Sequence, residues 1–327
     1  MPGTETKKPK SRRIRRYTQL MAAVLYNCHI KGFADGKIYK GDVKSVCGPG
    51  LNCYSCPGAV ASCPLGSLQS SLVNARFRAP YYILGTLLLF GLFLGRVICG
   101  FLCPVGLIQE LLHRIPSPKW KKGRITRVLS YCKYVVLALF VIAVPLFQYA
   151  PGFCKYICPA GTFEAGFPLV FKNKLLRTML GRLFTIKVLL LVLILIGCVF
   201  CFRAFCRFLC PLGAIYSFFH PVAVFEIRVD STKCTHCNAC VRCCPMDIRT
   251  VGDRECVHCG SCIDACPEQC IRYGTDLSPK KHPVRTVVRI LLLCLILFLL
   301  ILGFCKGDLS ALRQKAVRIC YECIGIG

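Results

Sequence analysis

Acidic side chains are scarce in this chain of 327 residues, and several familiar cofactor motifs are missing. Asp and Glu together number 15 against 43 Lys and Arg, which gives a formal net charge of +28. The sequence has no Walker loop, no Gly-x-Gly-x-x-Gly motif and no Cys-x-x-Cys-His haem-attachment site. These absences argue against a P-loop nucleotidase, a Rossmann-type dehydrogenase and a c-type cytochrome. Histidine is scarce too, and we interpret His29, which lies in an apolar run, as a packing residue rather than a haem ligand.

The surplus of basic residues does not indicate nucleic-acid binding, because it is not interleaved with an aromatic recognition surface on a soluble domain. Much of it lies beside apolar runs, in the stretch 119–127 and in the N-terminal tail at Lys7, Lys8, Lys10, Arg12, Arg13, Arg15 and Arg16. Such clusters usually mark the cytoplasmic flanks of membrane spans. The N-terminus shows no signal-peptide cleavage pattern, so we expect residues 20–33 to be retained.

Apolar residues make up 55% of the chain, and the mean hydropathy of +0.55 predicts a membrane protein. Four runs approach the roughly 20 residues that cross the hydrocarbon layer. They are Tyr81–Cys103, Lys133–Tyr149, Lys187–Phe202 and Val287–Phe304. A fifth run, Tyr17–Phe33, is shorter and contains polar residues, so we expect it to cross only in part. A buried core helix is the alternative for any one run, but four such runs favour a membrane.

Cysteine is the other excess, with 28 residues. Secreted disulfide scaffolds can be as rich in cysteine, but they are short and lack long apolar runs. Here the cysteines recur at short spacings and several precede proline, which favours thiolate ligands for metal clusters.

The clearest motif occurs twice within residues 221–283, which we call the insert. Each copy has the spacing Cys-x2-Cys-x2-Cys-x3-Cys-Pro, beginning at Cys234 and at Cys256. In this bacterial two-cluster ferredoxin pattern, the fourth cysteine of each run ligates the other [4Fe–4S] cluster. The predicted ligands are Cys234, Cys237, Cys240 and Cys266 for cluster 1, and Cys256, Cys259, Cys262 and Cys244 for cluster 2. Two zinc sites are the alternative, but zinc does not need this doubled spacing. The neighbouring Cys243 and Cys270 are predicted to be small buried residues.

A second repeat joins apolar runs to Cys-Pro-x-Gly elements. The pattern Arg-x2-Cys-x-Phe-Leu-Cys-Pro-x-Gly occurs at 96–106 and again at 203–213, and shorter elements occur at 63–66 and 158–161. We interpret Tyr17–Pro116 and Arg127–His220 as two parallel halves related by an axis near the membrane normal. If the halves pair, a possible inner-face cluster site forms from Cys99, Cys103, Cys206 and Cys210, with Arg96 and Arg203 offsetting its charge. Helix packing is the alternative role for these cysteines.

The same reasoning predicts a possible outer-face cluster site. The spacing of the cysteines alone does not identify its ligands. Its candidate thiols are Cys154, Cys158, Cys47, Cys53, Cys56 and Cys63, which is six for a site that takes four. A disulfide or simple packing is the competing interpretation. Packing is also the default for Cys28, Cys132, Cys198, Cys201, Cys294 and Cys305. The lone pair Cys320 and Cys323 gives a weak redox or metal signal.

With these motifs, the chain resembles the membrane polyferredoxins of the NapH, MauN and NosR type, from about Arg96 to Cys270. The resemblance implies a membrane electron-transfer subunit with a partner redox protein and often a quinol pool. The extra cysteines and the final span depart from the simplest NapH pattern, and the chain has no flavin-binding domain of the kind that NosR carries.

Together these features predict an all-α membrane bundle of four or five transmembrane helices in two parallel repeats, with a small α+β ferredoxin-like segment. The predicted divisions are a basic cytoplasmic tail (1–16), two membrane halves (17–126 and 127–220), the insert (221–283), a final transmembrane helix (284–305) and a Cys-x-x-Cys tail (306–327).

The expected function is single-electron transfer between a cytoplasmic or quinol donor and a membrane or extracytoplasmic redox partner. We expect a prokaryotic cell membrane, with the insert on the cytoplasmic side and 47–63 and 154–158 on the far side. No catalytic acid, base or nucleophile stands out. The alternative function is a metal-handling or assembly factor that uses its thiols or clusters to reduce or transfer metal.

Overall fold

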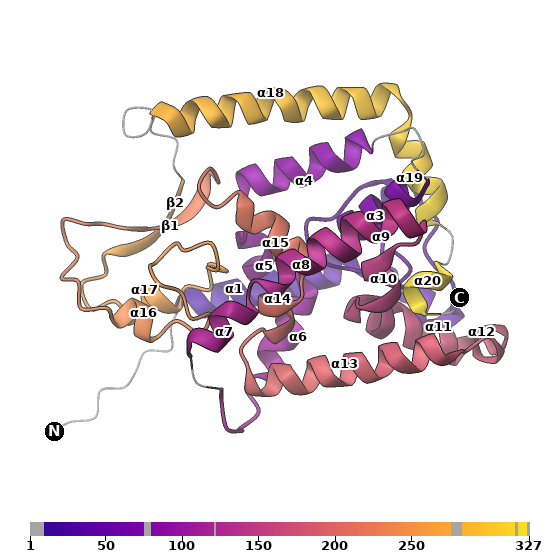
Figure 1. Cartoon of the computed structure of the whole chain (residues 1–327), viewed down its shortest axis with the longest axis horizontal. Coiled ribbons are helices and arrows are strands. Elements are labelled where there is room, and N and C mark those ends of the chain that lie inside the picture. The colour runs from indigo at the N-terminus through magenta and orange to yellow at the C-terminus, as the bar shows by residue number, and fades with distance from the viewer. Residues whose placement is uncertain (1–9, 75–79, 121, 276–282, 318–319, 326–327) are drawn as a thin grey trace.

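The computed structural model describes residues 10–74, 80–120, 122–275, 283–317 and 320–325, and residues 1–9 of the predicted basic tail lie outside them. Long helices run along the long axis of the molecule (Figure 1). Three helical stretches among the described residues are long and apolar enough to cross a membrane, namely Arg124–Gln148, α13 (Arg182–Phe200) and α18 (Pro283–Cys305). They coincide with three of the four apolar runs predicted to be spans.

The fourth predicted span, 81–103, is divided into two helices rather than forming one continuous helix. α4 (Tyr81–Phe93) ends just before Gly95, whose φ of +49° suits glycine, and α5 (Val97–Phe101) follows as a separate helix. The 13 residues of α4 extend about 20 Å, which is less than the ~30 Å of the hydrocarbon core. α4 packs instead against α18, where the absence of side chains at Gly85 and Gly303 permits close approach.

The predicted partial span 17–33 is likewise divided. α1 (Lys10–Tyr26) ends before Asn27, and α2 (Ile30–Asp35) begins after His29. One face of α1 buries Arg15 and Gln19, while Leu20 and Met21 remain exposed. The His29 ring nitrogen Nδ1 lies 3.1 Å from the carbonyl of Pro57, which is consistent with a packing role.

Each of the four Cys-Pro-x-Gly elements starts a helical segment, because proline fits the first helical position and its missing N–H costs nothing there. α3 (Pro64–Asn74), α6 (Pro104–Leu112) and α15 (Pro211–Phe218) begin at these prolines, and a π-helical turn (Gly161–Gly166) follows the fourth. Short helices α5, α10 (Gly152–Tyr156) and α14 (Ala204–Phe208) precede three of the four elements. The sequence repeat is therefore also a structural repeat.

The remaining elements of the bundle are short. They are a 3-10 turn (Asp42–Ser45), α7 (Arg124–Leu129), α8 (Cys132–Val136), a π-helical turn (Leu137–Ala143), α9 (Val144–Gln148), α11 (Phe167–Lys172) and α12 (Lys174–Thr178).

The insert contains the described sheet, in which β1 (Phe225–Val229) pairs antiparallel with β2 (Ile271–Thr275). Two short helices, α16 (Ala239–Arg242) and α17 (Ser261–Ala265), lie between the strands in sequence. The insert lies at one end of the bundle, and α19 (Asp308–Ala316) and α20 (Tyr321–Ile324) lie at the opposite end (Figure 1).

Two carboxylates anchor the insert to the bundle. Glu255 accepts hydrogen bonds from Arg96 at 2.8 Å and from Lys133 at 2.5 Å. Asp247 accepts from Arg127 and Arg207, each at 3.1 Å. Two of the scarce acidic residues thus join the insert to basic side chains of the bundle.

Candidate iron–sulfur sites

The first cysteine set of the insert surrounds one cavity. Its lining includes four thiols predicted to bind together, Cys234, Cys237, Cys240 and Cys266, with Cys270 beside them. Cys237 is exposed and the other three are half-buried. The fold therefore brings the distant Cys266 to the first three cysteines, as the crossed ligation pattern requires. Cys270 is buried as predicted, and its sulfur lies 3.4 Å from that of Cys266.

The second set of the insert is also gathered, and it is more deeply enclosed. Cys244, Cys256, Cys259 and Cys262 are all buried. Burial raises the pKa of Cys262 above its usual range, and Cys256, Cys259 and Cys244 raise it further, which places all four thiols within electrostatic reach. The two sets differ in exposure, so cluster 1 would lie nearer to solvent than cluster 2.

The spacing of the thiols bears on the zinc alternative. Among the described residues, no three His, Cys, Asp or Glu side chains converge closely enough to hold a single metal ion. A tetrahedral zinc ion would require its sulfurs within about 2.3 Å of one point. A cubane instead distributes its thiolates over four iron atoms.

The four thiols of the predicted inner-face site, which we call the inner site, also lie together. Cys99 is on α5 and Cys206 on α14, whereas Cys103 and Cys210 precede α6 and α15. All four are buried. Burial raises the pKa of Cys210, and Cys206, Cys99 and Cys103 raise it further. The two sequence halves therefore meet at these cysteines.

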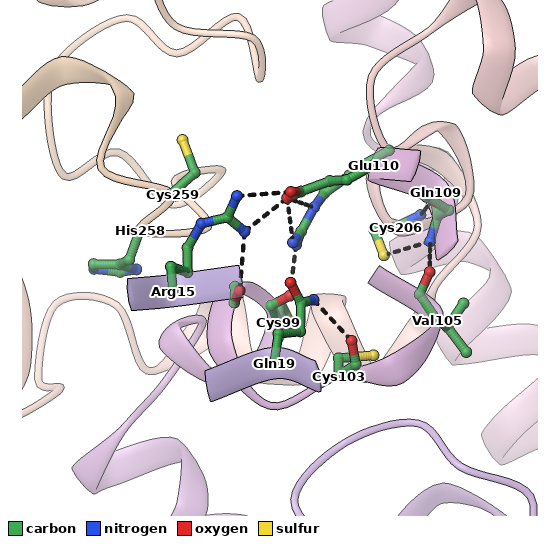
Figure 2. Close-up of polar contacts among 12 residues, drawn as sticks. Arg15, Gln19, Cys99, Cys103, Val105, Gln109, Glu110, Cys206, His258 and Cys259 are labelled. Carbon is green, nitrogen blue, oxygen red and sulfur yellow. Dashed lines mark hydrogen bonds and ion pairs between the residues drawn. The ribbon is translucent and has the colours of Figure 1, made fainter. Parts of the chain in front are cut away.

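A buried polar network supports the inner site (Figure 2). Glu110 accepts from Arg15 at 2.6 Å and from Arg203 Nε at 2.9 Å. Although burial acts to raise the pKa of Glu110, Arg203 and Arg15 lower it to about 2, so this carboxylate is charged at neutral pH. Arg203 also donates to the carbonyl of Cys99 at 2.5 Å, which fixes the backbone beside that thiol.

The charge partners of Arg96 and Arg203 differ from the sequence interpretation. We expected both to offset the charge of a cluster, but their direct partners are the carboxylates Glu255 and Glu110. Sequence spacing gave no sign of these pairs, because each joins elements far apart along the chain.

The inner site and the second set of the insert are direct neighbours. Gly100, between Cys99 and Cys103, is so close to the insert that a Cβ there would lie 2.1 Å from the carbonyl oxygen of Val257. Val257 follows Cys256 directly. The backbones that carry the two groups of thiols are therefore in van der Waals contact.

The outer site is a small cavity with five cysteines. Its lining includes Cys53, Cys63, Cys154, Cys158 and, from the C-terminal α20, Cys323. Cys47 and Cys56 are buried but do not line the cavity. Four of the six sequence candidates therefore line this cavity together with Cys323, for which the sequence offered only a weak Cys-x-x-Cys signal.

At each of the two membrane sites, the side-chain amide of a glutamine donates a hydrogen bond to a thiol. The two glutamines occupy equivalent positions in the repeat. Gln69 and Gln109 each lie six residues after a Cys-Pro cysteine. Gln69 donates to the sulfur of Cys154 at 3.3 Å, and Gln109 donates to that of Cys206 at 3.0 Å. Figure 2 shows the Gln109 contact. This matched pair of contacts, which the sequence interpretation missed, indicates that the two sites are related by the repeat.

The two membrane sites are separated by a single loop. A Cβ at Gly50 would lie 3.2 Å from the Cα of Cys103 at the inner site, and the next residue, Leu51, lines the cavity of the outer site. We expected the sites near opposite faces, but this loop brings them close together inside the bundle.

The other cysteines divide into two groups. Cys28, Cys132, Cys294 and Cys305 are exposed. Cys198 and Cys201 are buried near the inner site, and the Cys198 thiol lies 3.5 Å from Gln109 Oε1. None of these six was predicted to be a ligand.

The fold and these thiol groups define a membrane protein built to hold iron–sulfur clusters. Sequence comparison supports this class, because the 4Fe–4S binding domain family matches the chain three times, at residues 79–123, 134–177 and 182–227. Each match contains one of the three elements with cysteines four residues apart.

Curated relatives agree with the family match. An uncharacterised protein of Methanocaldococcus jannaschii is 34% identical over 48% of this chain and 62% of its own length. The putative electron transport protein YccM of Escherichia coli is 26% identical over 56% of this chain and 52% of its own. The methylamine utilization ferredoxin-type protein MauN of Methylobacillus flagellatus is 26% identical over 56% and 60%.

In sequence the chain is therefore similar to the ferredoxin-type 4Fe–4S proteins of the MauN kind, which agrees with the resemblance seen in its motifs. It spans less than two thirds of the length of each of these relatives. No solved structure matches it.

Proposed function

We propose that this protein carries single electrons through a series of [4Fe–4S] clusters, from the exposed end of the insert into the membrane bundle. The insert would hold cluster 1 at Cys234, Cys237, Cys240 and Cys266, and cluster 2 at Cys256, Cys259, Cys262 and Cys244. The inner and outer sites would hold two more. Bound clusters supply one-electron chemistry, and the protein supplies thiolates, burial and hydrogen bonds that set their potentials.

One observation carries this proposal, and it is the continuity of the thiol groups. The insert's first set is exposed at Cys237, and its second set abuts the inner site through Val257 and Gly100. The inner site in turn shares the loop at Gly50 and Leu51 with the outer site. Four groups of cysteines therefore form an unbroken series, which packing or isolated disulfides would not require.

The exposure of Cys237 indicates where electrons enter or leave at the insert. A soluble redox protein can approach cluster 1 there, and we propose such a protein, or a quinol, as the partner at the cytoplasmic side. The relatives named for electron transport and as ferredoxin-type support this kind of role. Glu255 and Asp247 hold the insert in a fixed position on the bundle, so cluster 2 would stay beside the inner site during transfer.

An iron count on anaerobically purified protein tests the proposal. Four cysteine-ligated cubanes require about sixteen irons per chain, against about eight for the insert alone. Replacement of Cys259 by Ala should remove an insert cluster, and replacement of Cys99 or Cys206 by Ala should remove the inner one. Electron paramagnetic resonance after reduction should show interacting clusters in the wild type.

Two results would contradict the proposal. Iron near eight that neither Cys99→Ala nor Cys206→Ala changes would leave only a membrane-anchored ferredoxin. Stoichiometric zinc without iron in anaerobic protein would exclude the cluster series altogether. Cys28→Ala, at an exposed cysteine outside all four groups, is the matched control and should leave the iron content unchanged.

A further inference from the structure

The outer site lacks one cysteine that the repeat would supply. In three of the four repeat elements, a cysteine lies four residues before the Cys-Pro cysteine, as in Cys99 and Cys103. In the first element, the position four residues before Cys63 is Ala59. The repeat therefore gives the outer site three thiols, from Cys63, Cys154 and Cys158, while a cubane of the same kind takes four.

The C-terminal segment brings a thiol to this place. Cys323 on α20 is 2% exposed and lines the outer cavity. Its side chain shares the lining of this cavity with that of Cys154, and its sulfur lies 3.5 Å from the Tyr54 hydroxyl. The backbone of α20 is also seated closely, since a Cβ at Gly161 would lie 2.6 Å from the Cys323 carbonyl oxygen.

A buried lysine contacts the backbones of both Cys323 and Cys154. Lys187 on α13 is 2% exposed, and its ammonium donates to the carbonyls of Cys154 at 3.0 Å and Cys323 at 2.5 Å. Among the described residues it forms no ion pair with a carboxylate, unlike the cations near the inner site. A charge within a membrane span is costly without a counter-charge, and an anionic cluster in the adjoining cavity would provide one.

Contacts made by α19 and by the start of α20 hold the C-terminal segment against the rest of the bundle. Arg313 of α19 pairs with Asp42 at 2.7 Å, and Lys315 donates to the carbonyl of Ser70 at 3.0 Å. The backbone N–H of Cys320 donates to the Ser55 hydroxyl at 3.1 Å. These contacts direct the chain back from the end of α18 into the outer site.

We propose that Cys323 is the fourth thiolate ligand of the outer cluster, so that the C-terminal segment completes and closes this site. The inference rests on the proposed function, because it requires a cluster at the outer site. Lys187 acts as a positioning residue that holds the Cys154 and Cys323 backbones side by side. Cys53, the fifth thiol of the cavity, is the competing ligand, and Cys320 remains a non-ligand at the half-buried start of α20.

Three matched variants test the assignment by iron and sulfide content per chain. Cys323→Ala should lose about four irons, whereas Cys53→Ala and Cys320→Ala should retain the wild-type content. The signals of the insert clusters should persist in all three variants, which shows that the protein has folded. Loss of about four irons in Cys53→Ala with none in Cys323→Ala would overturn the proposal.

A second measurement uses the unaltered protein. Cys323 should resist alkylation in the iron-loaded protein and react after iron is chelated in mild detergent, as read by mass spectrometry. Cys28, exposed between α1 and α2 and outside the four groups, should react equally in both states. Equal alkylation of Cys323 in both states, with about sixteen irons present, would refute the ligand role and leave the proposed function intact. A wild-type content near eight irons would instead refute the proposed function.

Discussion

At the residue scale, Glu110 is a single buried carboxylate that balances the charge of two buried arginines. One carboxylate lies between the guanidinium groups of Arg15 and Arg203, and all three side chains are buried. A buried charge that loses its partner is strongly destabilising, even where the intact pair adds little. Glu110 therefore controls the stability of the region around Cys99.

The substitution Glu110→Gln should lower the free energy of unfolding by about 3–5 kcal/mol, because it leaves two buried cations without a counter-charge. Denaturant unfolding in detergent, followed by circular dichroism, measures this loss. Glu226→Gln is the matched control, since Glu226 pairs with the partly exposed Arg228 at 3.0 Å. That change should cost less than about 1 kcal/mol. Similar losses in both variants would show that the buried network is not a stabilising centre.

At the scale of elements, the short helices position the thiols more than the long ones do. α5 and α14 carry Cys99 and Cys206, and the prolines that start α6 and α15 place Cys103 and Cys210 at helix N-termini. The contact of α5 with the insert depends on a residue without a side chain. At Gly100, the bundle and the insert therefore pack directly against each other.

The substitution Gly100→Ala should separate α5 from the insert, because the added Cβ would meet the Val257 carbonyl at 2.1 Å. Overpacking of this kind costs about 1–3 kcal/mol of stability. Electron transfer from the insert clusters to the membrane clusters should also slow, as measured by rapid-freeze paramagnetic resonance.

Gly181→Ala provides the control, because nothing lies within 4 Å of a Cβ at Gly181. It should leave both the stability and the transfer rate close to those of the wild type. Unchanged transfer in Gly100→Ala, with the insert clusters intact, would show that electrons do not pass through this contact.

At the scale of the whole molecule, the ends of the bundle carry different structures. The insert lies at one end and the C-terminal helices α19 and α20 lie at the other (Figure 1). α13 connects the two regions, since it begins at Arg182 and its last turn contacts the loop at Ser117 through the Val199 carbonyl. If α13 crosses the membrane, the regions flanking its two ends face opposite sides.

Reporter tags inserted after Ser117 and after Gly181 should therefore report opposite sides of the membrane, with Ser117 on the cytoplasmic side. The physical reason is that the 19 apolar-rich residues of α13 extend about 29 Å, which matches the hydrocarbon core. Protease protection in right-side-out and inverted vesicles measures the two positions. Cleavage of both tags in the same vesicles would exclude α13 as a span.

The sequence by itself determined the features that arise from neighbouring residues. Three long apolar helices formed where apolar runs were long enough, and helices began at Cys-Pro because proline suits the first helical turn. The doubled spacing from Cys234 to Cys266 predicted cysteine groups that the insert indeed brings together. These predictions needed no knowledge of distant contacts, because spacing and periodicity act within one or two turns of the chain.

Only the tertiary structure decided how distant elements meet. The run 81–103 is interrupted because Gly95 turns the chain and α4 packs along α18, and neither event follows from hydropathy. Glu110 and Glu255 became the partners of Arg203 and Arg96 because folding brought remote helices within hydrogen-bond distance. Cys323 joined the outer cavity for the same reason, since contacts between residues far apart in sequence depend on packing and leave no local pattern.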